Sequence, residues 1–233
     1  MKIAIFSLPG LSPGKYTIKD SRLDEVYRLA KSKKETYVQV ELVGEDAVFE
    51  SEAILVSLGA KMDLILRDLE FVETRLERAE DEKEKAILNK LKSILEKEEF
   101  IFQAPLAPEE KNAISGYSLF SLRPVIVVGE AELEDIHVLL SRALKETGYI
   151  SFFTAGEKET RAWLIKNGTT AWEAAGAVHS DIQKGFIRAE IIGYSDFINA
   201  GGENQAKQAG KLRLEAKDYL VQDADWVNFR FHK

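Results

Sequence analysis

The sequence contains no cysteine and only three histidines among its 233 residues. Without cysteine the chain can form neither a disulfide nor a thiolate metal site. His137, His179 and His232 lie too far apart for the usual spacing of zinc ligands. No apolar run reaches the roughly 18 residues that a membrane-spanning helix needs. The first residues, Met1–Phe6, read as a strand rather than as a signal peptide. We therefore expect no metal site, no membrane partner and a cytoplasmic location.

The sequence also lacks an excess of positive charge. Its 32 Lys and Arg stand against 39 Asp and Glu, which gives a net charge of −7. The whole deficit lies before Tyr149, because the part from this residue onward carries 11 Lys and Arg and 11 Asp and Glu. A net negative charge disfavours broad electrostatic binding of nucleic acid. Any contact with RNA would have to come from a local basic patch.

The C-terminal part of the chain has the clearest secondary-structure pattern. Residues 186–192 alternate between apolar and polar side chains, which predicts a strand with one buried face. Residues 150–154 and 161–165 predict a pair of strands joined by a turn that contains glycine. A helical segment follows Thr169, and residues 221–231 predict a last strand. Two strands, a helix and further strands are the order of a β-grasp, or ubiquitin-like, fold.

Stretches at two places in the chain resemble one known family. Residues 176–181, 184–192, 209–219 and 229–231 are similar to the C-terminal TGS domain of the YchF, or Obg-like ATPase, family, which is a branch of the P-loop GTPases. Residues 68–78 resemble the helical insertion of the same family. The resemblance implies three parts: a reduced P-loop-like α/β core over residues 1–52 and 114–148, an inserted antiparallel helical coiled-coil arm over 53–113, and an α+β β-grasp TGS domain over 149–233.

Within the core we expect three strands, near residues 2–6, 37–43 and 124–128. We also expect a helix that is capped by Asp20 or Ser21 and runs to about Lys31. The family has a further core strand between the last two of these strands, and no counterpart of it is recognisable in this sequence. We therefore predict that the first and the last of the three strands pair directly and in parallel.

The family's phosphate-binding loop has an altered counterpart after the first strand. In such a loop, backbone N–H groups surround the phosphates, a lysine reaches the β/γ oxygens and the next Ser or Thr binds Mg²⁺. Here Gly10 and Gly14 are separated by three residues rather than four, and Lys15 is followed by Tyr16, with Thr17 one place late. A structural turn and a working nucleotide cradle are the two interpretations of this loop.

Two further nucleotide motifs of the family are also altered. The D-x-x-G that senses Mg²⁺ and the γ-phosphate is replaced by residues 44–47, in which Glu45 and Asp46 have a different spacing. No asparagine of the base-reading motif follows the strand near residues 124–128. Because phosphoryl transfer depends on positioning and Mg²⁺ electrostatics, we hypothesise a non-catalytic relative with no catalytic residues and no cofactor. The alternative is residual binding of ATP or GTP with Mg²⁺ through Gly10, Gly14, Lys15 and Thr17.

A seam of apolar residues at spacings of three and four predicts the two helices of the arm. Its members are Leu55, Leu58, Met62, Ile65, Leu69, Val72 and Leu76, with Ile87, Leu88, Leu91, Ile94 and Leu95 on the second helix. The charges on the arm are interpreted most simply as solvated faces. A partner-binding role, or a homodimer formed through the arm, is the alternative.

The resemblance also implies a class of partner. Family members associate with ribosomes, and TGS domains occur in RNA-linked and regulatory proteins, so we expect a ribosome, an RNA or a translation-associated protein. Basic residues of the C-terminal part are the candidate contacts: Lys158, Arg161, Lys184, Arg188, Lys211, Arg213 and Arg230. The competing interpretation is that these side chains merely solvate the exposed faces of strands.

Overall fold

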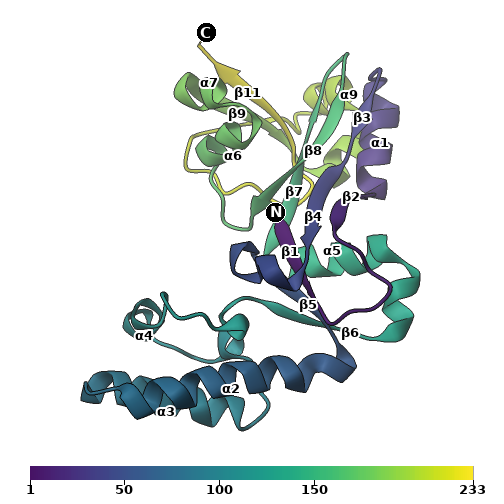
Figure 1. Ribbon diagram of the computed structural model, residues 1–233. Helices are drawn as coiled ribbons and strands as arrows, with labels where there is room; N and C mark the ends of the chain where they lie inside the picture. Colours follow the sequence, from purple (N-terminus) through teal and green to yellow (C-terminus); the bar gives the residue numbers. More distant parts are fainter. Residues whose placement is uncertain (233) are drawn as a thin grey trace. The chain divides into compact units, whose positions relative to one another are not determined.

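A computed structural model of the chain describes residues 1–232, and Figure 1 shows it as a ribbon. The backbone contacts divide the chain into two compact units. The first contains Met1–Tyr16 and Val40–Thr147, and the second contains Thr17–Gln39 and the residues from Gly148 onward. Among the described residues, no helix combines the length and the apolar character that crossing a membrane requires.

The first unit is built on a five-stranded sheet. Its strands lie in the order β2 (Gly14–Ile18), β4 (Val38–Val43), β1 (Lys2–Phe6), β5 (Ala53–Ser57) and β6 (Val125–Val128). The pairs β4–β1, β1–β5 and β5–β6 are parallel. The central strands are apolar along nearly their whole length and are buried on both faces, as is typical of parallel sheets covered on both sides.

The prediction that β1 pairs directly with the strand near residues 124–128 is wrong. Strand β5 lies between them, with Ile54 aligned with Ala4 on one side and with Val125 on the other. The prediction that Leu55 begins the helical seam is wrong for the same reason, because Leu55 lies within β5. A short apolar run that is buried on both faces has no period of its own, and Leu55 happens to stand at heptad spacing from the helix that follows.

Two helices of the first unit form a hairpin, α2 (Lys61–Arg78) and α3 (Glu82–Leu95). Asp81 caps α3 by accepting a hydrogen bond from the backbone N–H of Glu84. The hairpin is antiparallel, since ion pairs join Lys92 to Glu73 and Arg75 to Glu84. Much of the predicted seam lies in the core of this unit, including Ile65, Val72, Leu88, Leu91 and Leu95, whereas Leu58 and Met62 are exposed. The remaining helices are the short α4 (Pro108–Ala113) and α5 (Ile136–Glu146).

The second unit contains a six-stranded sheet. The order is β10 (Arg213–Glu215), β9 (Phe186–Ile192), β11 (Trp226–Phe231), β7 (Tyr149–Ala155), β8 (Thr160–Lys166) and β3 (Glu35–Thr36). Strands β7 and β8 form an antiparallel hairpin, and β11 runs antiparallel to β9 and parallel to β7. The strands predicted near residues 150–154, 161–165 and 186–192 are confirmed, and so is a last strand within residues 221–231.

Helices pack on the two faces of this sheet. Phe152 packs with the buried alanines of α6 (Ala171–Val178), whose start is closed by a capping box of Thr170 and Glu173; α7 (Ser180–Lys184) follows it. The next residue of β7, Phe153, points to the opposite face because side chains alternate along a strand. There it meets Arg22 of α1 (Ser21–Ala30). Helices α8 (Tyr194–Ala200) and α9 (Glu203–Gln208) complete the unit.

The helix predicted to begin near Ser21 is confirmed as α1, but its contacts assign it to the second unit. Arg22 bonds to the carboxylates of Asp20 and Asp223, with the contact to Asp223 at 2.6 Å. Strand β3 pairs with β8, and the Ser32 hydroxyl lies 2.7 Å from that of Thr160. The contacts therefore divide the chain differently from the predicted domain boundaries, since the sequence interpretation placed this segment in the core of residues 1–52.

Candidate functional site

The candidate phosphate loop leads into a strand rather than into a helix. Ser7 and Gly10 have positive φ angles of 44° and 89°, and the chain then forms β2 from Gly14 onward. In a phosphate-binding loop the Gly-Lys-Ser/Thr residues open a helix, and the N-terminus of that helix faces the phosphates. Here Lys15 and Thr17 are exposed on a strand that borders β4. The loop therefore lacks the helix N-terminus that attracts a phosphate.

Tyr16 and Thr17 of this strand form hydrogen bonds with residues outside it. The Tyr16 hydroxyl donates a hydrogen bond to the Ser12 carbonyl oxygen at 2.8 Å. The Thr17 hydroxyl accepts a longer one, at 3.4 Å, from the side chain of Gln39. Because neighbouring side chains of a strand point to opposite faces, Tyr16 projects away from the face that Lys15 and Thr17 share. The Tyr16 hydroxyl therefore does not take the place beside Lys15 that a magnesium-binding hydroxyl would have.

A carboxylate already binds the start of the loop. Glu45 accepts hydrogen bonds from the backbone N–H of Ser7 at 3.0 Å and from its hydroxyl at 3.2 Å. The other oxygen of Glu45 pairs with Arg67 at 3.4 Å, and the Arg67 guanidinium lies over the ring of Phe6 at 4.7 Å. A phosphate at this position would meet a fixed negative charge, and the residues present do not fit a magnesium nucleotide.

The sequence interpretation missed the contact between Glu45 and Ser7, although a signal for it exists. Ser7 follows β1 and Glu45 follows β4, and these neighbouring strands are parallel. The carboxyl ends of parallel strands meet at one edge of a sheet, so residues that follow two such strands lie close together. Without the pairing order of the strands, nothing in the sequence connects residues 44–47 with Ser7.

Two of the candidate partner-binding residues lie directly opposite each other. Arg188 on β9 is in register with Arg230 on β11, and both side chains are exposed. Like charges opposite each other across two strands are destabilising. The buried carboxylate of Glu190 compensates for one of them, because it accepts hydrogen bonds from Arg230 and from Asn228. Among residues 1–232 no ion pair of Arg188 is described, so this cation remains available to a ligand.

Glu190 is charged at neutral pH despite its burial. Burial raises the pKa of Glu190, but the hydrogen bonds from Asn228 and Arg230 outweigh that effect and leave the pKa below its ordinary value. The carboxylate thus holds the Arg230 guanidinium on the face of the sheet to which Glu190 belongs. We call Arg188, Arg230 and Asn228 the β9–β11 basic pair site, since two cations and one amide lie beside each other there.

The other candidate residues are dispersed over the second unit, and most of them already contact another side chain. Arg161 lies over the ring of Trp163 at 4.2 Å, and Lys211 pairs with Asp196 at 3.2 Å. Arg213 is aligned with Ile191, which places it on the sheet face opposite to Glu190, and it donates to the Tyr219 hydroxyl at 3.1 Å. Lys184 lies 4.0 Å from Asp181. Lys158 is exposed near the turn between β7 and β8, and no ion pair of it is described within residues 1–232.

Comparisons with known proteins agree with the fold and with the motifs. The profile of a protein family described as "YchF-GTPase_C: Protein of unknown function (DUF933)" matches residues 149–232. A solved structure of the Schizosaccharomyces pombe YchF GTPase superimposes with a TM-score of 0.78 and 18% sequence identity, covering 99% of this chain and 97% of that chain. At this identity the likeness supports the fold alone.

Curated relatives are similar in sequence over larger or smaller parts. The protein called "Ribosome-binding ATPase YchF" of Haemophilus ducreyi is 34% identical over 232 residues, which covers 73% of this chain and 64% of that protein. The protein of the same name in Haemophilus influenzae is 60% identical over 82 residues, which covers 35% of this chain and 23% of that protein. The chain thus spans between about a quarter and two thirds of the length of these two relatives.

The parallel strands of the first unit, with helices inserted between them, define a mixed α/β protein with a P-loop-like core. The matched family model, the similar relatives and the similar fold support its membership of the YchF, or Obg-like, family.

Proposed function

We propose that the protein is a non-catalytic member of its family that acts as a binding module. Its C-terminal β-grasp TGS domain and its helical coiled-coil arm would contact a ribosome, an RNA or a translation-associated protein. The observation that carries this proposal is the altered loop, in which Ser7 binds Glu45 and Gly14–Ile18 forms a strand. Without a helix N-terminus and with a carboxylate in place, the loop offers a triphosphate little stabilisation.

The names of the relatives support the choice of partner. Several relatives are called ribosome-binding ATPases. The relative at 60% identity matches over only 82 residues, a length close to that of the region that the family profile matches, residues 149–232. If binding and hydrolysis are separable properties of such proteins, a member with an altered nucleotide loop retains the first. Residual binding of ATP or GTP through Gly14 and Lys15 is the alternative that the word ATPase in those names favours.

The β9–β11 basic pair site is the surface that we assign to the partner. Arg188 lacks a described ion pair, and Arg230 is held in place by Glu190. Two guanidinium groups side by side match the oxygens of a phosphate or a carboxylate, because each presents a planar fork of donors. The electrostatic part of such binding weakens as salt is added.

Co-sedimentation with purified ribosomes tests the proposal. The variant Arg188→Gln/Arg230→Gln removes two charges and keeps a hydrogen-bond donor beside Glu190. The control Lys33→Gln/Lys217→Gln removes two charges from exposed lysines of the same unit. We expect the wild type and the control to pellet with ribosomes equally, with or without ATP or GTP, and the arginine variant to pellet about tenfold less. Ribosome binding that depends on added nucleotide, or that both variants lose equally, would contradict the proposal.

A further inference from the structure

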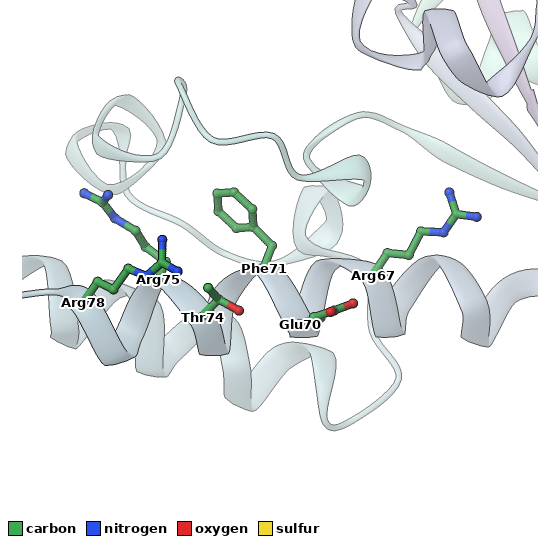
Figure 2. Close-up of a pocket in the computed structure, with 6 residues that line it drawn as sticks. All are labelled: Arg67, Glu70, Phe71, Thr74, Arg75 and Arg78. Atoms are coloured by element: carbon green, nitrogen blue, oxygen red, sulfur yellow. The ribbon is translucent and has the colours of Figure 1, made fainter.

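The face of α2 turned toward the segment before β6 carries a row of arginines with an aromatic residue between them. Arg67, Phe71, Arg75 and Arg78 recur at spacings of three and four, which places them on one side of a helix. Together with Thr74 and Glu70 they line a groove of about 430 Å³. Figure 2 shows Arg67 at one end of the row, Arg75 and Arg78 at the other, and Phe71 between them.

The spacing of these side chains fits an extended chain of anionic groups. At 1.5 Å per residue, Arg67 and Arg78 are separated along the helix axis by about 16 Å, and Arg75 and Arg78 by about one turn. Phe71 packs against Tyr117, with ring centroids 5.6 Å apart, so its position is fixed while one part of the ring remains accessible. The groove therefore presents cations at both ends and an aromatic ring in the middle.

The ion pairs that these arginines form compete only weakly with the binding of a ligand. Arg67 pairs with Glu45 at 3.4 Å and Arg75 with Glu84 at 2.7 Å, and about half of each arginine side chain is exposed. Exposed pairs of this kind contribute little net free energy. Among residues 1–232 no ion pair of Arg78 is described. Glu84 does not depend on Arg75 alone, because it also accepts a hydrogen bond from the Tyr117 hydroxyl at 2.6 Å.

We propose that this α2 arginine groove binds single-stranded RNA. Three guanidinium groups offer forked donors to successive phosphates, and the ring of Phe71 offers a surface on which an unpaired base can pack. An acidic protein segment would use the same cations but would have no use for the aromatic ring between them. Because the protein carries a net charge of −7, its overall electrostatic field repels RNA, and RNA binding depends on such a local basic site.

This inference takes its class of partner from the proposed function. Its site, the α2 arginine groove, is distinct from the β9–β11 basic pair site. The helical hairpin would hold a single strand of RNA, while the β9–β11 basic pair site contacts the ribosome. The two proposals therefore fail separately. Loss of RNA binding in vitro would leave the co-sedimentation result unchanged, and the reverse also holds.

Fluorescence anisotropy with a labelled ten-nucleotide oligouridylate tests the groove. The variant Arg75→Gln/Arg78→Gln removes two charges from it, and the control Lys97→Gln/Lys111→Gln removes two charges from exposed lysines elsewhere in the first unit. We expect the dissociation constant of the arginine variant to rise at least about tenfold and that of the control to change less than about twofold. With three phosphate contacts reduced to one, the slope of log affinity against log salt falls in magnitude from about 2 to about 0.7.

A gain of affinity provides a second readout that misfolding cannot imitate. Glu70 is the one acidic residue that lines the groove, and Glu70→Gln removes its repulsion of phosphate. We expect this variant to bind the oligouridylate about two- to threefold more tightly. No binding by the wild type, equal losses in the two double variants, or unchanged affinity in Glu70→Gln would overturn the proposal. A polyglutamate peptide that binds as tightly as the RNA would overturn it in favour of an acidic protein partner.

Discussion

The carboxylate of Glu45 and the backbone N–H of Ser7 are joined by a hydrogen bond of 3.0 Å at the start of the altered phosphate loop. The bond joins the residue after β1 to the residue that begins the turn after β4. It supplies an internal anion where a phosphate-binding loop would hold a ligand. Arg67 balances the charge of this anion at 3.4 Å, so the contact is electrostatically complete without a nucleotide.

Replacing Glu45 with alanine removes that anion but does not create a nucleotide site. We expect Glu45→Ala to lower the free energy of unfolding by less than about 1 kcal/mol, because the ion pair to Arg67 is partly exposed. We expect no saturable binding of ATP with Mg²⁺, since Gly14–Ile18 remains a strand. Thermal unfolding and a fluorescent-nucleotide titration of this variant measure the two effects. Tight nucleotide binding in Glu45→Ala would show that the carboxylate alone blocks a working loop.

Asp68 is a buried carboxylate that fastens helix α2 to the segment before β6. It accepts hydrogen bonds from the backbone N–H groups of Phe120 and Ser121, at 2.6 and 2.8 Å, and from the Ser121 hydroxyl at 2.6 Å. Asp68→Ala leaves these buried donors without an acceptor, so we expect a loss of about 3 kcal/mol or more. Urea unfolding measures it. A loss below about 1 kcal/mol would contradict this role.

The same residue has a pH dependence of defined sign. Burial raises the pKa of Asp68 above its ordinary value, against the lowering effect of the hydrogen bonds from Ser121 and Phe120. The folded state therefore holds this proton more tightly than the unfolded state does. The contribution of Asp68 to the free energy of unfolding grows as the pH falls through the raised pKa and is smallest at neutral pH. The stability difference between wild type and Asp68→Asn should shift toward the wild type on acidification, and a shift in the other direction would refute the sign.

Tyr219 binds the buried carboxylate of Asp225 in the second unit. Its hydroxyl donates to Asp225 at 2.8 Å, and the backbone N–H of Gln222 donates to the same oxygen at 2.9 Å. We expect Tyr219→Phe to lower the free energy of unfolding by about 1 to 3 kcal/mol. Burial and the bond to Asp225 raise the pKa of Tyr219 to about 12. The stabilisation is therefore complete below the ordinary tyrosine pKa and is lost as the pH rises toward 12, which unfolding curves of the two proteins at increasing pH measure.

Gly185 marks a place where two backbone segments approach closely. A Cβ atom at this position would lie 2.1 Å from the carbonyl oxygen of His232, which is backbone and cannot rotate away. We expect Gly185→Ala to lower the free energy of unfolding by about 1 to 3 kcal/mol. Gly59→Ala is the matched control, since nothing lies within 4 Å of its added Cβ. Equal melting temperatures for the two variants would contradict the close approach.

Local patterns predicted the strands of the C-terminal part and the helix at Ser21, because apolar–polar alternation and helix capping depend only on residues close together in the sequence. These local patterns gave wrong predictions where the structure depends on contacts between residues that are far apart in the sequence. Strand β5 is apolar on both faces and has no period, so Leu55 was assigned to the helical seam. The assignment of α1 to the second unit rests on contacts such as Arg22 with Asp223, which no local pattern contains.

Some features of the candidate site could likewise be predicted from the sequence, and others could not. The altered spacing around Gly14 and Lys15 was visible in the sequence, and so were the basic residues of the C-terminal part. The bond between Glu45 and Ser7 and the register of Arg188 with Arg230 required the order and pairing of strands. The α2 arginine groove was not recognised for another reason. Its arginines are interspersed with acidic residues in the sequence, and of the acidic residues of α2 only Glu70 lines the groove.

The most direct test of the central claim is a titration of the wild-type protein with fluorescent ATP and GTP, with and without Mg²⁺, alongside Lys15→Ala. Because the loop leads into a strand and its first N–H is bound to Glu45, the account predicts no saturable binding and no difference between the two proteins. Saturable binding that requires Mg²⁺ and disappears in Lys15→Ala would contradict it.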